Sequence, residues 1–577
     1  MLNTMQFLAS KASQAIEALY SSQVESGAIQ LSPTRKDFEG DYTIVVFPFL
    51  KTSRKSPEQT ATEIGGWLKE NCPEIENFNV VKGFLNLSLS NLFWKESLAS
   101  IVSDPSFGTF PDNGKTVMVE FSSPNTNKPL HLGHVRNNLL GSSVSDILKA
   151  VGNNVIKATL VNDRGVHICK SMYAWEKRFG GATPESSGIK GDHLVGDCYV
   201  EYAKMEKEDP SVGEEVHKML RDWEAGDPQV HALWKMMNSW VLAGFEQTYK
   251  ALGISFDKVY YESQTYLLGK ELVQKGLDSG VFVKDPDGSV WCDLTADGLD
   301  RKLLLRSDGT SVYMTQDLGT AEKRFAESHL DSHVYVVGNE QDYHFQVLKL
   351  ILKKLGFDWA ERIYHLSYGM VELPEGKMKS REGTVVDADD LLEKMYGEAK
   401  TASEESGKLA DMSEEEKDAL YRMIGLGALK YFILKVDPKK TMLFDPKESI
   451  DFNGNTGPFI QYTHARIKSI LRKASALGLS AGIPESAGLS AKEIRLVKLL
   501  CAYPGKVKDA ADGLSPALIA NYSYELAKEF NQYYHDTPVL KEPDADVLSL
   551  RLSIIEEVAV TLSKAMGLLG ITLPERM

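Results

Sequence analysis

Cysteine is scarce in this chain of 577 residues. The five cysteines are scattered along the sequence, and no two of them form a CxxC pair. This argues against a zinc site and against a disulfide framework. We therefore expect no zinc cofactor, and the scarcity fits a protein of the reducing cytoplasm.

Long apolar runs are missing as well. No stretch approaches the ~20 apolar residues that span a bilayer, so we expect no membrane partner. The first 20 residues alternate apolar and polar side chains at helical spacing, without a basic start and a continuous apolar run. That pattern predicts an amphipathic helix and not a signal peptide. The chain also contains no internal repeat and no low-complexity tract.

An excess of positive charge is the third absence, since the formal net charge is −15. This value does not exclude a nucleic-acid partner, because binding depends on local basic patches rather than on the whole surface. Hydrophobic residues make up 43% and charged residues 25% of the chain, the balance of a globular protein. A chain of this length predicts three or four domains.

The order of apolar patterns predicts three regions. Residues 1–110 are expected to form a small α+β unit, with strands at 42–49 and 78–90. In residues 111–395, strands at 116–121, 155–161, 333–338 and 362–371 alternate with helices, which predicts a Rossmann-like, doubly wound parallel sheet. A charged, helix-rich stretch at about 173–260 is expected to be an insertion. Residues 396–577 give no strand pattern and predict an all-helical domain.

The most informative stretch is FSSPNTNKPLHLGHVRNNLLG, residues 121–141. A buried strand ends at Phe121, a polar loop follows, and a helix is expected to begin near His134. Ligands of open α/β sheets bind at the carboxyl ends of strands, where a helix N-terminus favours anions. The histidines His131 and His134 would aim imidazole N–H groups at a triphosphate, and Gly133 would let it approach the backbone.

Two other interpretations of the histidine pair stay open on spacing alone. Two histidines three residues apart are more often ordinary surface or core residues. They could also ligate a metal, although no third ligand lies nearby in the sequence. A second element, EGKMKSREG at 375–383, is a glycine-bounded basic loop whose cations Lys377, Lys379 and Arg381 suit a polyphosphate. By itself, such a loop is more often a solvated surface segment.

Together the two elements resemble, in the same order, the HIGH and KMSK signatures of class I aminoacyl-tRNA synthetases. The wider text is similar to the arginyl-tRNA synthetase family over essentially the whole chain. SPNTNKPLHLGH resembles that family's first signature, and GDYTIVVFP and GFLNLSL resemble its N-terminal domain. GPFIQYTHARIKSIL at 457–471 and GLLGITLPERM at 567–577 resemble its anticodon-binding domain.

The resemblance implies that arginine is activated with ATP and Mg²⁺ and is then esterified onto tRNA(Arg), in a reaction that needs bound tRNA already for the first step. It implies catalytic roles for His131, His134, Lys128, Lys377, Lys379 and Arg381, and ATP contacts from Pro124, Gly133, Met378 and Ser380. The family often lacks the second lysine of KMSK, and Lys128 is expected to replace it here. A second departure is Asn162-Asp163-Arg164-Gly165, where the family more often has a GDWG-type run.

Choosing arginine requires carboxylates that match a planar guanidinium. The resemblance assigns this role to Tyr313 and Asp317, one helical turn apart, with Glu262 and Gln341 as further polar contacts. Asn125 is expected to hold the α-amino or carboxylate group of the substrate. Two other interpretations stay open: Asp317 could cap a helix that starts at Leu318, and Glu262 could be an ordinary surface charge.

The C-terminal region carries a mixture of basic and aromatic residues that suits single-stranded RNA bases. The expected tRNA contacts are Tyr462, Arg466 and Lys468, and the basic track is expected to include Lys430, beside the aromatic Tyr431 and Tyr533. We expect a monomer that binds no DNA. Two other hypotheses remain, a different class I enzyme such as the cysteinyl one, and a synthetase-like RNA-binding protein without catalysis.

Overall fold

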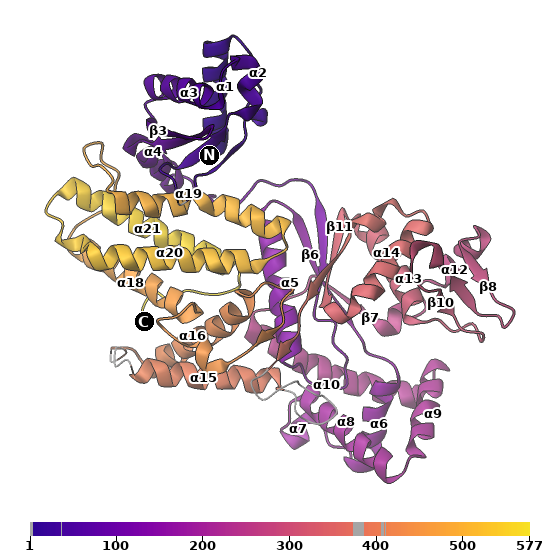
Figure 1. Ribbon diagram of the computed structural model, residues 1–577. Helices are drawn as coiled ribbons and strands as arrows, with labels where there is room; N and C mark the ends of the chain where they lie inside the picture. The colour runs from indigo at the N-terminus through magenta and orange to yellow at the C-terminus, as the bar shows by residue number, and fades with distance from the viewer. Residues whose placement is uncertain (1–3, 36, 373–385, 406–408, 410) are drawn as a thin grey trace.

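The computed structural model describes residues 4–35, 37–372, 386–405, 409 and 411–577 (Figure 1). The N-terminal unit, at the top of the view, is a four-stranded antiparallel sheet in the order β1-β2-β4-β3. Helices pack against this sheet and bury a shared apolar core. Its main elements are α1 (Thr4–Tyr20), β1 (Leu31–Pro33), β2 (Tyr42–Val45), α3 (Pro57–Asn71), β3 (Ile75–Val81), β4 (Phe84–Leu89) and α4 (Asn91–Val102).

Two of the strand predictions in this unit were wrong in detail. Strand β2 ends at Val45, and the chain turns into a short 3₁₀ helix at Phe47–Phe49. The segment expected as one strand is a hairpin of β3 and β4, with Lys82 and Gly83 at φ values of 50° and 81°. Two positive φ values in succession are typical of a tight hairpin turn.

The central sheet has five parallel strands in the order β12-β11-β5-β6-β7, which confirms the predicted sheet class. The strands are β5 (Thr116–Glu120), β6 (Asn154–Val161), β7 (Lys258–Tyr261), β11 (Ser332–Gly338) and β12 (Ile363–Tyr368). Strand β7 was not predicted from the sequence. The strand predicted at 362–371 is in fact two strands, β12 and β13 (Val371–Glu372), and β13 pairs with β14 (Met442–Leu443).

Helices cover both faces of this sheet. Along β5, Val117 and Val119 belong to the apolar core that includes α5, whereas Met118 belongs to the core that includes α13 and α14. This alternation is what the two-residue period of a strand requires when both faces are buried. The three helices are α5 (Leu132–Ala150), α13 (Tyr313–Ser328) and α14 (Asp342–Lys354).

Two insertions leave the sheet near its carboxyl edge. The first, between β6 and β7, is helical as expected and forms the lower lobe in Figure 1. Its long helices are α6 (Val166–Arg178), α8 (Gly191–Glu208), α9 (Val212–Glu224) and α10 (Pro228–Leu252). The second follows β7 and holds α11 (Glu262–Thr265), α12 (Lys270–Asp278) and an antiparallel sheet of β8 (Phe282–Lys284), β9 (Val290–Cys292) and β10 (Lys302–Leu305).

In the described part of the C-terminal region, the two-residue strand β14 is the one departure from helices and their connecting loops. The long helices of this region pack on one another and on α5, so this region and the parallel sheet share one core. They are α15 (Ala388–Glu405), α16 (Glu414–Leu434), α18 (Gly457–Ala476), α19 (Ala491–Asp512), α20 (Pro516–Asp536) and α21 (Ala545–Gly567). Within the described residues, no helix is long and apolar enough to cross a membrane.

A buried ion pair ties α13 to the strand that leads into the first signature. The guanidinium of Arg324 donates to Glu120 at the end of β5 and lies 4.5 Å from the ring of Tyr260. Glu120 also accepts a hydrogen bond from the hydroxyl of Ser123, at 3.2 Å. The helix that carries Tyr313 and Asp317 is therefore fixed against the loop that carries Asn125.

Candidate active site

The first signature begins with a strained turn. Ser122 and Ser123 adopt φ values of 70° and 45°, in the left-handed region that side chains other than glycine rarely enter. Two hydrogen bonds stabilise this strained conformation. Ser122 N donates to Asn137 Oδ1 at 2.6 Å, and Ser123 N donates to Thr159 Oγ1 at 3.1 Å. The turn redirects the chain so that Asn125 pairs beside Asn162, at the carboxyl end of β6.

The two imidazoles lie at the N-terminus of α5, with ring centroids 3.9 Å apart. His131 is the N-cap of the helix, and its Nδ1 accepts a hydrogen bond from Gly133 N at 3.1 Å. His134 Nδ1 accepts from His131 N at 3.2 Å. Because each Nδ1 is an acceptor, each neutral ring must carry its proton on Nε2. Both rings thus keep an N–H donor for a ligand at the helix start.

The site keeps these rings neutral. Burial, together with the nearby charge of Lys128, lowers the pKa of His131 to about 4, and burial lowers the pKa of His134 well below its usual range. Burial also lowers the pKa of the Lys128 ammonium. A desolvated cation beside two N–H donors is a favourable environment for phosphate oxygens, which would offset the lost hydration.

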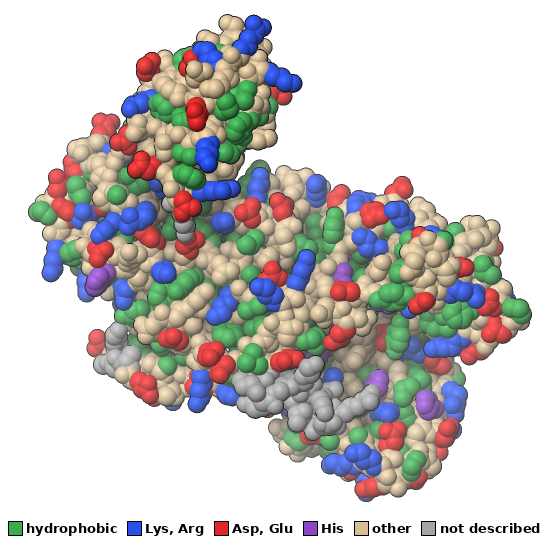
Figure 2. Space-filling model, viewed as in Figure 1, with side chains coloured by type: hydrophobic (Ala, Val, Ile, Leu, Met, Phe, Trp, Pro, Cys, Tyr) green, Lys and Arg blue, Asp and Glu red, His purple; other side chains and the backbone are tan. Residues whose placement is uncertain are grey.

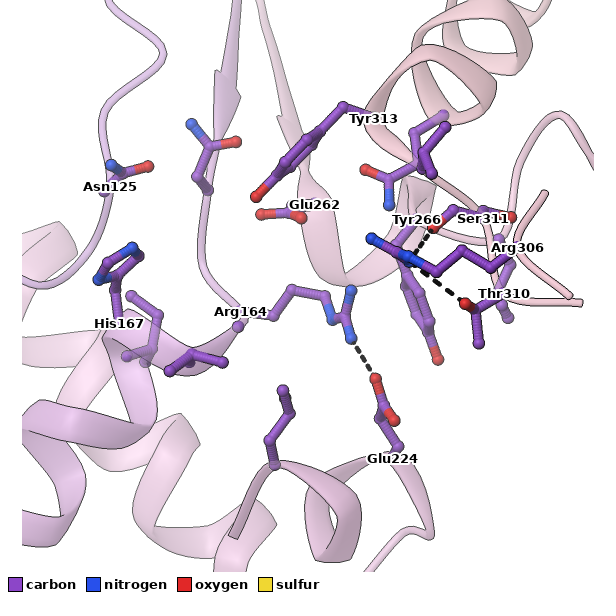
Figure 3. A pocket seen from close by; sticks show the side chains of 18 of the residues that line it. Asn125, Arg164, His167, Glu224, Glu262, Tyr266, Arg306, Thr310, Ser311 and Tyr313 are labelled. Carbon is purple, nitrogen blue, oxygen red and sulfur yellow. Dashed lines mark hydrogen bonds and ion pairs between the residues drawn. The ribbon is translucent and has the colours of Figure 1, made fainter. Parts of the chain in front are cut away.

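A cleft of about 870 Å³ opens at the carboxyl ends of β5, β6 and β7 (Figure 3). In Figure 2 the surface is hollowed between the lobe of α12 and β8 and the lobe of α6 and α9. The cleft includes Asn125, Glu262 and Tyr313 from the predicted site. Its other polar or charged lining residues are Asn162, Arg164, His167, Glu224, Tyr266, Lys270, Arg306, Thr310, Ser311 and Gln316.

Acidic groups gather around this cleft. Glu262 begins α11 directly after β7, and burial raises the pKa of its carboxyl to about 7. Figure 3 shows the ring of Tyr313 pointing toward Glu262. Asp317 follows Tyr313 by one turn inside α13, so it does not cap a helix at Leu318. Its carboxylate accepts a hydrogen bond from His344 Nε2 at 2.7 Å and is close enough to raise the pKa of Glu262.

Gln341 lies outside the cleft that Glu262 lines. It ends a 3₁₀ turn at Asn339–Gln341, beyond the end of β11, and its side chain is exposed. It does not line the 870 Å³ cleft. His344, three residues later, makes the contact to Asp317 and was missed by sequence analysis. The pattern QDYH offered a signal, because residues 341 and 344 lie one turn apart.

The Asn162-Asp163-Arg164-Gly165 run forms one wall of the site. Asp163 is buried and accepts hydrogen bonds from Ser263 N at 2.8 Å and Ser263 Oγ at 2.7 Å, which joins the ends of β6 and β7. Arg164 reaches into the cleft, pairs with Glu224 at 2.6 Å and lies 4.0 Å from the ring centroid of Tyr266. The departure at this run is visible in the sequence, but the pairing of its guanidinium inside the cleft is not.

The second signature lies outside the described residues, and with it Lys377, Met378, Lys379, Ser380 and Arg381. The described segments on either side of it are held in place. On one side β13 pairs with β14. On the other, Leu132 N donates to Val386 O at 3.0 Å and Ala388 N donates to Leu130 O at 2.9 Å. Residues 386–388 therefore run beside the HLGH segment.

The proposed RNA contacts lie on α18, far from the cleft along the chain. Tyr462 and Arg466 line a separate cavity of about 310 Å³, together with Phe452 and the C-terminal Met577. The Arg466 guanidinium lies 4.8 Å from the Tyr462 ring centroid and donates to Asn531. Lys468 does not line this cavity and pairs with Glu575 at 3.2 Å.

Part of the expected basic and aromatic track was wrong. Lys430 is only 4% exposed, and its ammonium donates to the carbonyl of Gly570 at 2.6 Å. Tyr431 and Tyr533 are buried in the helical core. These residues are buried because neighbouring segments cover the helix faces on which they lie. Residues that cluster in the sequence therefore need not form a patch on the surface.

A sheet of parallel strands, an HLGH helix start and a cleft at the strand ends define a class I aminoacyl-tRNA synthetase. The family model for the catalytic domain of class I (R) tRNA synthetases matches residues 98–445. Models of the arginyl-tRNA synthetase N-terminal domain and of the DALR anticodon-binding domain match residues 6–89 and 460–577. The chain belongs to the arginyl-tRNA synthetase family. The domain boundaries predicted at residues 110 and 395 stay predictions.

Curated relatives and solved structures agree with this assignment. An arginine–tRNA ligase of Bacteroides thetaiotaomicron is 57% identical over 97% of this chain and 98% of its own length. One from Porphyromonas gingivalis is 55% identical over the full length of both chains. The structure of Thermus thermophilus arginyl-tRNA synthetase superposes with a TM-score of 0.80 at 26% identity, covering all of both chains.

Proposed function

We propose that this protein activates L-arginine with ATP to arginyl-adenylate and transfers the arginyl group to the 3′ end of tRNA(Arg). We propose further that it acts as a monomer. We also propose that it works in the cytoplasm, whose reducing conditions suit its five free cysteines. The observation that carries the catalytic proposal is the pairing of two features at one sheet edge. Neutral imidazole donors stand at the start of α5, which follows β5, and a cleft that Glu262 and Glu224 line opens at the carboxyl ends of β5, β6 and β7.

The carboxylates account for the choice of arginine. Glu262 and the exposed Tyr313 line the cleft, and Asp317 lies close enough to raise the pKa of Glu262. We assign the two carboxylates to the planar guanidinium and Tyr313 to a further contact. Arg164 pairs with Glu224, and His344 donates to one oxygen of Asp317. We therefore assign Glu262 and Asp317, rather than Glu224, to the substrate. Lysine would leave acceptors of this planar site unpaired, which is the physical basis for rejecting it.

Activation then needs positioning and charge stabilisation, without a nucleophile from the protein. The arginine carboxylate attacks the α-phosphorus of ATP. The bond between this phosphorus and the oxygen that bridges to the β-phosphate breaks, and pyrophosphate leaves. ATP enters as its magnesium complex, and the ion offsets phosphate charge. His131 and His134 donate from Nε2, and Lys128 adds a positive charge as negative charge shifts to the leaving group. We assign Asn125 to the α-amino or carboxylate group of arginine.

In the second step the 2′-hydroxyl of the terminal adenosine attacks the carbonyl carbon of the adenylate. The ester forms, the bond between the carbonyl carbon and the phosphate oxygen breaks, AMP leaves, and the proton of the hydroxyl is released. We propose that the cavity lined by Tyr462 and Arg466 contacts the anticodon region, where stacking on aromatic rings suits unpaired bases.

Amino-acid-dependent exchange of pyrophosphate into ATP tests the proposed function. We expect exchange with arginine alone among the standard amino acids, and only when tRNA(Arg) is present. Exchange with cysteine instead would identify a different class I enzyme. No exchange with any amino acid, with or without tRNA, would leave the hypothesis of an RNA-binding protein without catalysis.

The raised pKa of Glu262 predicts a pH-dependent affinity for arginine. The protonated carboxyl loses the charge that attracts a guanidinium, so affinity falls as pH drops through about 7. Between pH 8 and pH 6 the KM for arginine should therefore rise about tenfold. Steady-state exchange at saturating ATP and tRNA measures it. Glu262→Gln should abolish this pH dependence and raise the KM at pH 8, and a variant that keeps the wild-type profile would contradict the assignment.

The RNA site makes a separate prediction. Tyr462→Ala should lower kcat/KM for tRNA(Arg) by about 10- to 100-fold, because it removes one base-stacking surface. Exchange at saturating tRNA should stay within twofold of wild type, since the cleft is untouched. Lys473→Ala, an exposed basic residue on the same helix, is the matched control. If both variants have the same kcat/KM for tRNA(Arg), or if Tyr462→Ala raises only the KM for arginine, the anticodon assignment fails.

A further inference from the structure

Helix α8 of the first insertion lies directly against the first signature. Gly196 sits where a Cβ atom would come within 2.8 Å of Pro129 Cδ and 3.6 Å of Lys128 Cα. A Cβ at less than 3.0 Å from a ring carbon of proline cannot be accepted without a shift of the backbone. The absence of a side chain at Gly196 is thus what lets α8 support the segment just before HLGH.

The N-terminus of the same helix holds the other side of the signature. Lys190 Nζ lies 2.6 Å from Asp389 Oδ2, and His193 Nε2 lies 3.0 Å from the same oxygen. Asp389 also accepts from Thr248 Oγ1 of α10 at 2.9 Å, and its own N–H donates to Asp387 Oδ1 at 2.8 Å. These bonds fix residues 387–389 against the insertion.

Residues 386–388 in turn pair with Leu130–Leu132, and His131 faces Asp387 across this short ladder. The backbone around His131 therefore lies between two fixed elements. One is α5, whose N-cap is His131, and the other is the segment at 386–389, which Lys190 and His193 hold through Asp389. Helix α8 thus supports Lys128 through Gly196 and supports His131 through Asp389. The contacts join an insertion that has no residue in the signature to the groups that would hold ATP.

The Asp192, His193 and Asp389 side chains are also close enough together to suggest a metal site. Lys190 argues against that interpretation. Its ammonium lies 3.3 Å from Asp192 Oδ2 and 2.6 Å from Asp389 Oδ2, so a cation already stands between the carboxylates. Asp192 itself is fully buried and packs against Gly244 of α10. The cluster is a structural tie between three helices.

We propose that α8 is a positioning platform for the first signature, and that Gly196, Lys190, His193 and Asp389 are positioning residues for Lys128 and His131. The proposal rests on the proposed function for its kinetic readout. Displacing a phosphate-binding group by a fraction of an ångström affects the transition state more than the bound ground state. The platform should therefore act on kcat far more than on arginine binding.

Gly196→Ala is the sharpest test. We expect kcat for arginine-dependent exchange to fall about tenfold or more, with the arginine Kd and the melting temperature almost unchanged. Amide hydrogen exchange in residues 128–135 should rise, while exchange in α10 stays as in wild type. Gly213→Ala in α9 of the same insertion is the matched control, because its nearest neighbour to a Cβ is the flexible Glu206 carboxylate at 4.0 Å.

A second pair of variants decides the outcome if Gly196→Ala does not fold. His193→Ala should lower kcat about threefold to tenfold, and His193→Gln, which can still donate to Asp389, should restore it to within twofold. Full kcat in both Gly196→Ala and His193→Ala, or equal losses in His193→Ala and His193→Gln, would overturn the platform. Absence of exchange in the wild-type enzyme would count against the proposed function instead, and hydrogen exchange at 128–135 would still test the platform.

Discussion

Asp317→Ala should raise the KM for arginine by about 100-fold or more, or abolish arginine-dependent exchange. The variant removes a carboxylate that would pair with the substrate guanidinium and leaves donors of a desolvated ligand without acceptors. Affinity for tRNA(Arg) should stay within twofold, since Asp317 lies on α13 and the proposed anticodon cavity lies in the C-terminal helices. Exchange kinetics and filter binding of tRNA measure the two quantities on one preparation.

Two further variants make this experiment specific. Asp317→Asn keeps the shape of the side chain and loses its charge, so it should raise the KM for arginine nearly as much as the alanine variant does. Glu322→Ala on the same helix removes a surface carboxylate that pairs with Lys275 at 3.4 Å and should leave arginine use unchanged. Weakened tRNA binding with a normal arginine KM in Asp317→Ala would contradict the assignment.

Lys128→Ala should lower kcat for arginine activation by about 10²- to 10³-fold, the typical loss when one preorganised charge donor is removed. The KM for ATP should change by less than about threefold, because the contact strengthens only as charge moves onto the leaving pyrophosphate. Burial desolvates the Lys128 ammonium and lowers its pKa, so its charge acts in a poorly screened environment.

Rapid-quench measurement of adenylate formation, at saturating arginine and tRNA, isolates this step. Lys149→Ala, at the exposed end of the same helix α5, is the control and should be as active as wild type. Equal losses in ATP affinity and in rate would mean that Lys128 binds ATP uniformly and does not act in the transition state.

The first signature could be placed from the sequence because its geometry is local. A buried strand, a polar loop and a helix start follow one another within residues 116–135, so the two imidazoles had to lie at the carboxyl edge of a parallel sheet. Asp317 was also predictable relative to Tyr313, since a helix brings residues four apart onto one face. What local spacing could not predict was the partner of Asp317, His344, which belongs to the next helix.

The elements that were missed depend on distant packing. Strand β7 has four residues and carries Lys258 at its start, so it gives no alternation long enough to recognise. Arg164 is held by Glu224, 60 residues away in sequence, and no pattern in the NDRG run indicates that pairing. Lys430 was expected on a basic surface track, yet the chain end near Gly570 covers it. Each of these contacts joins segments that only the folded core brings together.

A crystal structure with a non-hydrolysable arginyl-adenylate analogue tests the central claim most directly. We expect the phosphate mimic within hydrogen-bonding distance of His131 Nε2 or His134 Nε2, and the guanidinium against Glu262 and Asp317. An analogue bound with its guanidinium away from both acids, or with its phosphate mimic away from the start of α5, would contradict the proposed site.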